Sequence, residues 1–277
     1  MPVLFNPPAE KVCQSNAIVA GRATRHFVPS FVGTHSIKAV LSGAAEWQVD
    51  GRARRVTPHW VLPVNKGERY SLTIESTTPV QTCCAFFAPG FLEGVKSEVY
   101  CDGDLELLCR YEPNSNELRK LLVRTWNAVV EGDALESDAS MFDLAAALLR
   151  VADAQSREKH LLPLRKPKAR DDVYQRLNAS RDYMVENLST PISLDSCAAV
   201  ACMAPFHFHR LFKACYGEPV SAFVRRIRMD KAARLLKNTD LAVDGIALDC
   251  GYQSGTAFTR AFNLRFGCSP SHFRKNC

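Results

Sequence analysis

A short segment occurs twice in the last third of the chain, and this repeat constrains the fold more than any other feature. The segment FHRLFKACYG begins at Phe208 and FTRAFNLRFG begins at Phe258, so Phe, Arg, Phe and Gly recur at one offset. Each copy follows a stretch of small residues, LDSCAAVA or VDGIALDC. A short helix, a tight turn and a second helix make a helix-turn-helix. The repeat therefore predicts two helix-turn-helix units in one all-α domain.

The second helix of the first copy is amphipathic. At 100° per residue, Phe208, Leu211 and Phe212 share the side that must face the core. The opposite face and its flanks suit a DNA major groove, where Arg bonds guanine and Lys neutralises phosphate. The residues predicted to bind DNA from this helix are Phe206, His207, His209, Arg210 and Lys213.

His207 and His209 also have the His-x-His spacing that metal sites use. On a helix the two imidazoles lie about 200° apart and do not converge on one ion, whereas on a strand they would. We therefore predict no metal or other cofactor. The DNA interpretation directs His209 toward base edges and His207 toward the backbone, and the alternative is that both are simply solvated.

The second copy has a weaker reading face. Gly255 leaves the start of its second helix nearly bare, and Arg260 is the strongest candidate for a base contact. Phosphate contacts or DNA shape would supply the rest. The residues predicted to bind DNA from this helix are Thr256, Thr259, Arg260 and Asn263.

The segment PVSAFVRRIRMDKAARLLKN, between the copies, predicts a long helix with Phe223 and Ile227 inside. Its arginines, Arg225, Arg226 and Arg228, are expected largely outside. Roughly 18 residues at ~1.5 Å each span about 27 Å. A helix of this length can hold two recognition helices near the roughly 34 Å spacing of successive major grooves.

The rest of the chain predicts an α+β multidomain protein. Short strands with turn signals such as Asp50-Gly51 fill the first 90 residues and are typical of a barrel or sandwich. Two helical stripes follow, and their apolar surface predicts dimerisation. We expect a barrel over 1–110, dimerisation helices over 111–157, a linker rich in Pro and basic residues over 158–172, and the DNA-binding domain over 173–277.

The segment HRLFKACYGEPVSAFVRRIRMDKAARLL, followed by IALDCGY and FTRAFNLRFGCSPSHFR, resembles the C-terminal domain of the AraC/XylS family of bacterial transcription regulators. The resemblance covers about 100 residues. It implies binding to double-stranded DNA, usually as part of a homodimer that contacts RNA polymerase. The chain departs from the family where Ala204 and Ala242 replace a serine N-cap, Cys202 replaces a turn glycine, and Gly245 interrupts a short helix.

Residues 20–90 are similar to the cupin-like barrel that many family members use for sensing, on the segments VLSGAAEWQVDG and LPVNKG. Metal-binding cupins carry His-x-His on a strand, whereas His35 and His59 stand alone here. Arginine is dense in this part, and guanidinium groups bind anions bidentately. The predicted effector is a small anion, such as a cyclic nucleotide or an organic acid, and it is expected to be held by some of the residues Arg22, Arg25, Lys66 and Arg69. The alternative is that these residues form a solvated basic face.

Composition limits the remaining classes of protein. The formal charge is +6, and residues 171–277 carry 14 Lys and Arg against 10 Asp and Glu, which is compatible with nucleic acid. No signal sequence or membrane span is present, so we expect a cytoplasmic protein. No catalytic signature is present either, so we expect no enzyme. The expected function is that of a transcription regulator that acts as an activator, and the alternative is a regulator controlled by a protein partner with no small-molecule effector.

Overall fold

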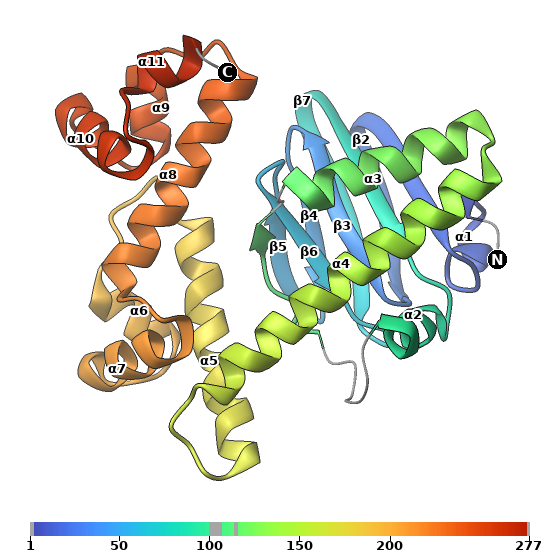
Figure 1. Ribbon diagram of the computed structural model, residues 1–277, viewed down its shortest axis with the longest axis horizontal. Coiled ribbons are helices and arrows are strands. Elements are labelled where there is room, and N and C mark those ends of the chain that lie inside the picture. The colour runs from blue at the N-terminus through green and yellow to red at the C-terminus, as the bar shows by residue number, and fades with distance from the viewer. Residues whose placement is uncertain (1–2, 100–106, 114–115, 276–277) are drawn as a thin grey trace. The chain divides into compact units, whose positions relative to one another are not determined.

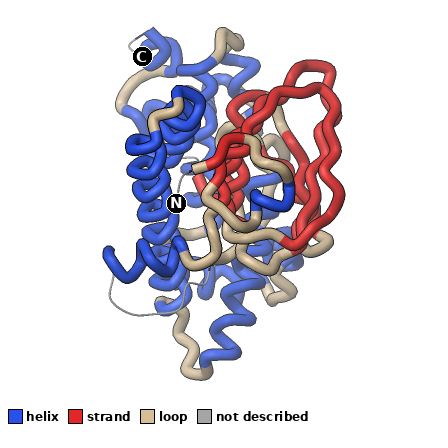
Figure 2. Tube along the Cα trace, turned by 90° about the vertical axis from the view of Figure 1, so that its right-hand side faces the viewer, coloured by secondary structure: helices blue, strands red, loops and turns tan. Residues whose placement is uncertain are grey.

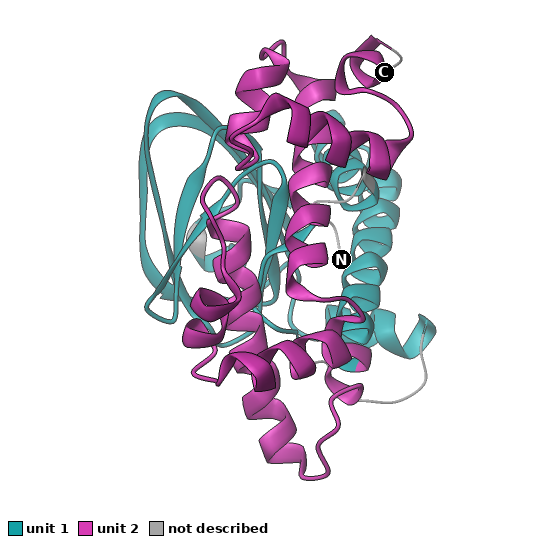
Figure 3. Ribbon diagram, turned by 90° about the vertical axis from the view of Figure 1, so that its left-hand side faces the viewer, with its two compact units in different colours: residues 1–156 teal, residues 157–277 magenta. Residues whose placement is uncertain are grey.

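The computed structural model describes residues 3–99, 107–113 and 116–275. The chain divides into two compact units, residues 1–156 and residues 157–277 (Figures 1 and 3). Strands gather in one part of the molecule and the remainder is helical (Figure 2). None of the described helices is both long enough and apolar enough to cross a membrane.

Unit 1 contains a sheet of eight described strands. Six of them follow the order β1-β2-β7-β3-β6-β8, and the other two lie off this path, where β4 pairs with β7 and β5 pairs with β4. The long strand β7 joins two parts of it, because it pairs with β2 along its length, with β3 at one end and with β4 at the other. The strands are β1 (Leu4–Phe5), β2 (Ala17–Val32), β3 (Ser36–Ser42), β4 (Ala45–Val49), β5 (Arg52–Val56), β6 (Trp60–Val64), β7 (Arg69–Phe86) and β8 (Glu112–Pro113).

The predicted cupin-like barrel is not confirmed, because the described sheet is not closed. Its outer strands β1 and β8 are each two residues long and pair on one side only in the described chain. Closing a barrel needs strands that continue the register across the last gap, and strands this short do not reach. The predicted hairpin is confirmed: Asp50 and Gly51 both have positive φ and connect Val49 to its partner Arg52.

Helices cover one face of this sheet, where α3 and α4 run side by side (Figure 1). Leu118 and Leu122 of α3 and Leu144 of α4 pack with Ile37 and Ala39 of β3 in one core. The apolar stripes from which dimerisation was predicted thus lie largely against the chain's own sheet. The described helices of this unit are α1 (Ala9–Val12), α2 (Phe91–Val99), α3 (Asn116–Glu131) and α4 (Ala134–His160), and the last residues of α4 belong to unit 2.

Unit 2 is all helical in its described part, as predicted. The two helix-turn-helix units are α6 with α7 and α9 with α10, and α8 connects them (Figure 1). Its helices are α5 (Pro167–Glu186), α6 (Leu194–Val200), α7 (Pro205–Tyr216), α8 (Val220–Asn238), α9 (Val243–Asp249), α10 (Gly255–Phe266) and α11 (Pro270–Lys275). Because α5 begins at Pro167, part of the expected linker over 158–172 is helix.

The repeated residues occupy equivalent places in the two helix-turn-helix units. The Phe212 ring packs on Phe223 of α8 with centroids 5.5 Å apart, and the Phe262 ring packs on Phe273 of α11 at 5.3 Å. The second helix of each helix-turn-helix, α7 or α10, ends at a glycine with positive φ, which is 75° at Gly217 and 74° at Gly267. Aromatic burial on one side and a left-handed stop at the end therefore define each helix.

The turn before α7 is strained at Cys202, whose φ is 50°. A left-handed conformation costs a residue other than glycine roughly 1–2 kcal/mol. Arg176 on α5 holds the turn: its guanidinium donates to the Ala201 carbonyl at 2.7 Å and also to the Cys202 carbonyl. The expected missing N-cap is confirmed, since Ala204 makes no side-chain hydrogen bond at the start of α7.

The second turn is built differently. Gly251 takes the left-handed position with φ 75°, and two residues separate it from the α10 N-cap Ser254, which accepts from the Ala257 amide. Only one residue separates Cys202 from the α7 N-cap Ala204. The second turn is therefore one residue longer, and it has both the glycine and the cap that the first turn lacks.

We expect Cys202→Gly to stabilise the first helix-turn-helix by about 1 kcal/mol, because glycine relieves the left-handed strain and regains only part of it as unfolded-state entropy. Amide hydrogen exchange of α6 and α7 should slow by roughly five-fold. Gly217→Ala is the matched control, since its added Cβ meets no atom within 4 Å and only the conformation is penalised. It should speed exchange by a similar factor; unchanged or faster exchange in Cys202→Gly contradicts the strain argument.

Candidate nucleic-acid interface

The outward face of α7 is polar and exposed as the sequence predicted. His207, Arg210 and Lys213 are exposed, and the Phe206 ring is 82% exposed at the helix start. The Arg210 guanidinium lies 3.4 Å from His207 Nδ1. Phe208, Leu211 and Phe212 are buried on the opposite side. The face thus offers the Arg210 guanidinium, which lies beside the His207 imidazole, and the Lys213 ammonium group.

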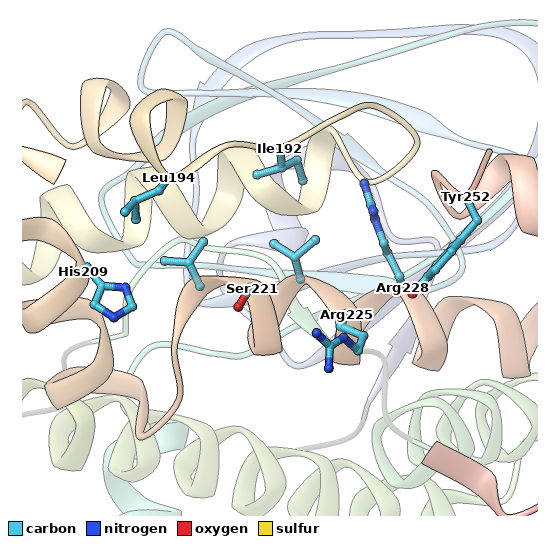
Figure 4. A pocket seen from close by; sticks show the side chains of 9 residues that line it. Ile192, Leu194, His209, Ser221, Arg225, Arg228 and Tyr252 are labelled. Carbon is cyan, nitrogen blue, oxygen red and sulfur yellow. The ribbon is translucent and has the colours of Figure 1, made fainter. Parts of the chain in front are cut away.

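His209 lies on the side of α7 that faces α8. Its side chain is half-buried and lines a hollow on α8 with Ser221, Arg225 and Tyr252 (Figure 4). Its direction toward base edges stays a prediction. The helical wheel placed it on a flank of α7, and the neighbouring helix α8 decides what that flank faces. The two histidines do lie on a helix and not on a strand.

The structure brings all four predicted residues of α10 together. Thr256, Thr259, Arg260 and Asn263 line one shallow hollow with Gly255. Gly255 has no side chain, and a Cβ placed there would lie 3.0 Å from Asp244 Oδ1, so the Asp244 side chain of α9 lies close to the start of α10. The sequence analysis missed Leu264, which is 78% exposed on the same helix. Its position outside the buried Phe258 and Phe262 stripe was the available signal.

The long helix α8 connects the two helix-turn-helix units of unit 2. Its 19 residues span about 28 Å. The expected outward placement of its arginines holds only for Arg225, which is exposed. Arg226 is half-buried and donates to Glu218 Oε1 at 2.9 and 2.7 Å. Asp230 bonds Arg265 of α10 at 3.2 Å, so a carboxylate on α8 anchors the second reading helix.

Arg228 connects the two helix-turn-helix units. Its Nε donates to the Leu188 carbonyl at 2.9 Å and its Nη2 to the Thr190 carbonyl at 2.7 Å, in the loop before α6. Burial lowers its pKa. Gly251, in the second turn, packs against the same group: a Cβ there would lie 2.4 Å from the Leu188 oxygen and 2.6 Å from Arg228 Nη2. This contact requires glycine, and the sequence analysis did not find it.

The four predicted effector residues do not converge. Arg22, Arg25, Lys66 and Arg69 are all exposed. Arg69 pairs with Val32 at one end of the β2–β7 ribbon, whereas Arg22 lies ten residues back along β2. At ~3.4 Å per residue, that separation is about 34 Å. The two side chains cannot hold one small anion.

Unit 1 instead encloses a lysine that the sequence analysis missed. Lys38 on the central strand β3 is 1% exposed, and its Nζ has no hydrogen-bond partner among the described residues. The amine lies 3.7 Å from the centroid of the Tyr70 ring and 4.0 Å from that of Phe86. Burial lowers the pKa of Lys38 to about 7. The signal was a single charge inside the apolar strand SIKAV.

Tyr70 shares this environment. Its hydroxyl is buried without a hydrogen-bond partner among the described residues, and burial raises its pKa. Cation–π contact compensates the Lys38 charge only in part. An unsatisfied buried amine beside an unsatisfied hydroxyl costs stability, and such a pair is a candidate for a role in binding.

The histidines of unit 1 make no metal site with the described residues, in which no group of three or more His, Cys, Asp or Glu side chains gathers. His35 is half-buried and its Nδ1 accepts from the Lys66 amide at 3.3 Å. Burial lowers the pKa of His35. The hydrogen bond fits the plain alternative, an ordinary structural histidine.

Comparison with known families and proteins bears on unit 2. Residues 197–276 match the family described as "Helix-turn-helix domain". Right origin-binding protein of Escherichia coli is 36% identical over 90 residues, which are 32% of this chain and 31% of that protein. The transcriptional activator AarP of Providencia stuartii is 35% identical over 88 residues, 32% of this chain and 65% of that protein. The chain thus spans about a third of the length of the first of these relatives.

Among solved structures, the chain is similar to the C-terminal domain of AraT, a response regulator from Geobacillus stearothermophilus. The identity is 30%, the match covers 37% of this chain and 85% of that chain, and the TM-score is 0.36. The family match falls in the C-terminal part of this chain, where the repeat lies.

Proposed function

We propose that this chain, whose C-terminal unit carries an AraC-type helix-turn-helix domain, is a cytoplasmic regulator of transcription that binds specific double-stranded DNA. Within the proposal, α7 reads bases in one major groove and α10 enters the next. The chain acts as a regulator and not as an enzyme. An activating role, through contact with RNA polymerase, follows from the AraC/XylS resemblance.

One observation carries the DNA proposal: two helices with equivalent cores, α7 and α10, each carry exposed polar residues. In Figure 1, α7 and α10 lie on one side of α8, and Figure 3 looks onto that side of unit 2. Two reading helices on one DNA face require a separation near one helical turn, roughly 34 Å. A connecting helix of about 28 Å is compatible with that separation once the width of the units is added.

The proposed effector is a small acid, and its proposed counter-ion is Lys38. A buried amine without a partner gains more from a carboxylate or phosphate than an exposed arginine does, because the surrounding dielectric is low. Lys38 is fully enclosed by Tyr70, Phe86 and their neighbours, so the acid must enter as these rings move. The alternative regulator, controlled by a protein partner, needs no such opening.

The proposed dimer uses the outer side of α3 and α4. Val130 is 58% exposed and Leu135 is 84% exposed near the connection between these helices. Arg119, Lys120 and Glu131 line a hollow on the same helices, so charges of both signs surround it. Two-fold contacts between copies commonly combine an apolar patch with such a rim.

Arg210→Ala should weaken binding to the selected DNA site by roughly 1–3 kcal/mol and relax base preference at one position, because a bidentate contact to guanine is lost. Lys213→Ala should instead reduce the salt dependence of binding with base preference kept. In vitro selection from random DNA with the wild-type chain supplies the site, and titrations at several salt concentrations measure both effects. An equal loss for Arg210→Ala on selected and random DNA refutes the assignment.

Lys38→Met should raise the stability of unit 1 at pH 7 by roughly 1–3 kcal/mol, since the unsatisfied amine is removed. The pKa of Lys38 in the folded protein is about 7 against 10.5 unfolded, so above pH 7 the unfolded chain binds more protons and wild-type stability rises with pH. Relative to the variant, the rise between pH 7 and 8.5 should approach roughly 1 kcal/mol per pH unit. If the free energy of unfolding changes with pH in the same way for the wild type and for Lys38→Met, the lowered pKa of Lys38 is contradicted.

Tryptophan fluorescence reports this unfolding selectively, because all three tryptophans, Trp47, Trp60 and Trp126, lie in unit 1. Adding organic acids and cyclic nucleotides tests the effector with the same readout. A bound acid should raise the unfolding midpoint of the wild type and leave Lys38→Met unchanged. If no acid shifts the wild type, the effector proposal fails and partner control takes its place.

Light scattering of the full chain at micromolar concentration should give a dimer, and the double variant Val130→Glu, Leu135→Glu should give a monomer because two carboxylates oppose their copies across the contact. A wild-type monomer contradicts the dimer. A variant that remains dimeric places the contact on another surface and contradicts the one proposed.

A further inference from the structure

A hollow of about 360 Å³ lies on α8 between the two helix-turn-helix units. Its apolar lining side chains are Ile192, Leu194, Val220 and Val224, of which Val220 and Val224 are buried. Polar groups surround them: Ser221 and Arg225 from α8, His209 from α7, and Tyr252 from the turn before α10 (Figure 4). No carboxylate lies among the lining residues. The hollow is therefore basic at its rim and apolar at its base.

Arg225 is the cation of this hollow that the protein leaves available. It makes no hydrogen bond or ion pair with the part of the chain that the structure describes, and it is exposed. Arg228 lines the same hollow, but two of its donors bond the Leu188 and Thr190 carbonyls. In Figure 4 the Arg228 side chain extends toward that loop, whereas the Arg225 guanidinium extends away from it.

The position of the hollow relates it to both reading helices. His209 is the neighbour of Arg210 on α7, and Tyr252 precedes the start of α10 by only a few residues. A duplex that places α7 in one major groove and α10 in the next passes across the middle of α8. At that point the minor groove and its two phosphate backbones face the protein.

We propose that this hollow binds a backbone phosphate of the DNA segment between the two major-groove contacts, with Arg225 as its counter-ion and Ser221 and His209 as hydrogen-bond donors. The proposal rests on the DNA-binding function proposed above. A guanidinium bonds two phosphate oxygens at once, and a hydroxyl and an imidazole can reach the same group. The apolar base suits the deoxyribose edges that adjoin the phosphate.

This assignment gives His209 a role different from that of its neighbour Arg210. A phosphate contact positions the duplex without reading its sequence, whereas a base contact specifies it. His209→Gln should therefore lower affinity for all DNA sequences by a similar factor. It should leave the selected consensus unchanged, in contrast to Arg210→Ala.

The deciding experiment measures the salt dependence of binding to the selected site with the full chain. Arg225→Gln should reduce the slope of log K against log salt by about one, the value for one phosphate contact. Arg225→Lys should keep the slope, because it keeps the charge. Lys168→Gln is the matched control: it removes one exposed charge in the first turn of α5, outside the hollow, and should leave the slope unchanged.

A second experiment removes the negative charge of single phosphates in the DNA backbone. Methylphosphonate linkages, placed one at a time through the central segment, should weaken wild-type binding at one or two positions. Arg225→Gln should be insensitive at those same positions. Inorganic phosphate at millimolar concentration serves as a third arm, and we expect it not to protect unit 2 from amide exchange when DNA is absent.

Three results would overturn the inference. They are an unchanged slope for Arg225→Gln, an equal loss of slope for Lys168→Gln, and protection by inorganic phosphate alone, which would indicate a site for a free anion. A wild-type chain that selects no DNA sequence refutes the proposed function itself. That outcome is distinguishable from binding that persists with Arg225 removed.

Discussion

Burial of paired phenylalanine rings is the constraint on which unit 2 depends. Phe208 and Phe212 in the first helix-turn-helix, and Phe258 and Phe262 in the second, are fully buried. Each such ring removes a large apolar area from water, worth roughly 1.5–3 kcal/mol. Since every reading helix must turn that side inward, its polar side has to face solvent. The reading faces thus follow from the cores.

The helical repeat was predictable from sequence because amphipathic helices carry their own signal every 3.6 residues. The sequence analysis located α7, α8 and α10 and the exposed faces of the reading helices. It could not locate the partners of Arg228, because these are carbonyls of the loop before α6 that tertiary packing brings near. His209 shows the same limit: periodicity places it on a flank of α7, and only the position of α8 decides what that flank lines.

In unit 1 the local features were predictable and the distant ones were not. The Asp50-Gly51 hairpin depends on two residues that tolerate positive φ, a property visible in sequence. Closure of the sheet depends on how strands far apart in sequence meet, and short hairpin spacing contains no information about it. The arginines were grouped by density alone, whereas register along β2 and β7 separates Arg22 from Arg69. Lys38 went unnoticed because one charge hardly alters the apolar pattern of its strand.

The two helix-turn-helix units differ in how they meet the same geometric demand. A left-handed residue must precede each reading helix, and the second unit uses Gly251, whose missing Cβ also lets the Leu188 carbonyl and Arg228 approach. The first uses Cys202 and needs the Arg176 guanidinium to hold the surrounding carbonyls. Arg176 of α5, outside the helix-turn-helix, thus compensates the strain in the first turn. The second turn is not strained, but it packs against Arg228, which bonds the loop before α6. Because each turn depends on a contact beyond its own motif, the two reading helices are coupled parts of one domain, and their separation is set by α8 and the contacts that Arg228 makes.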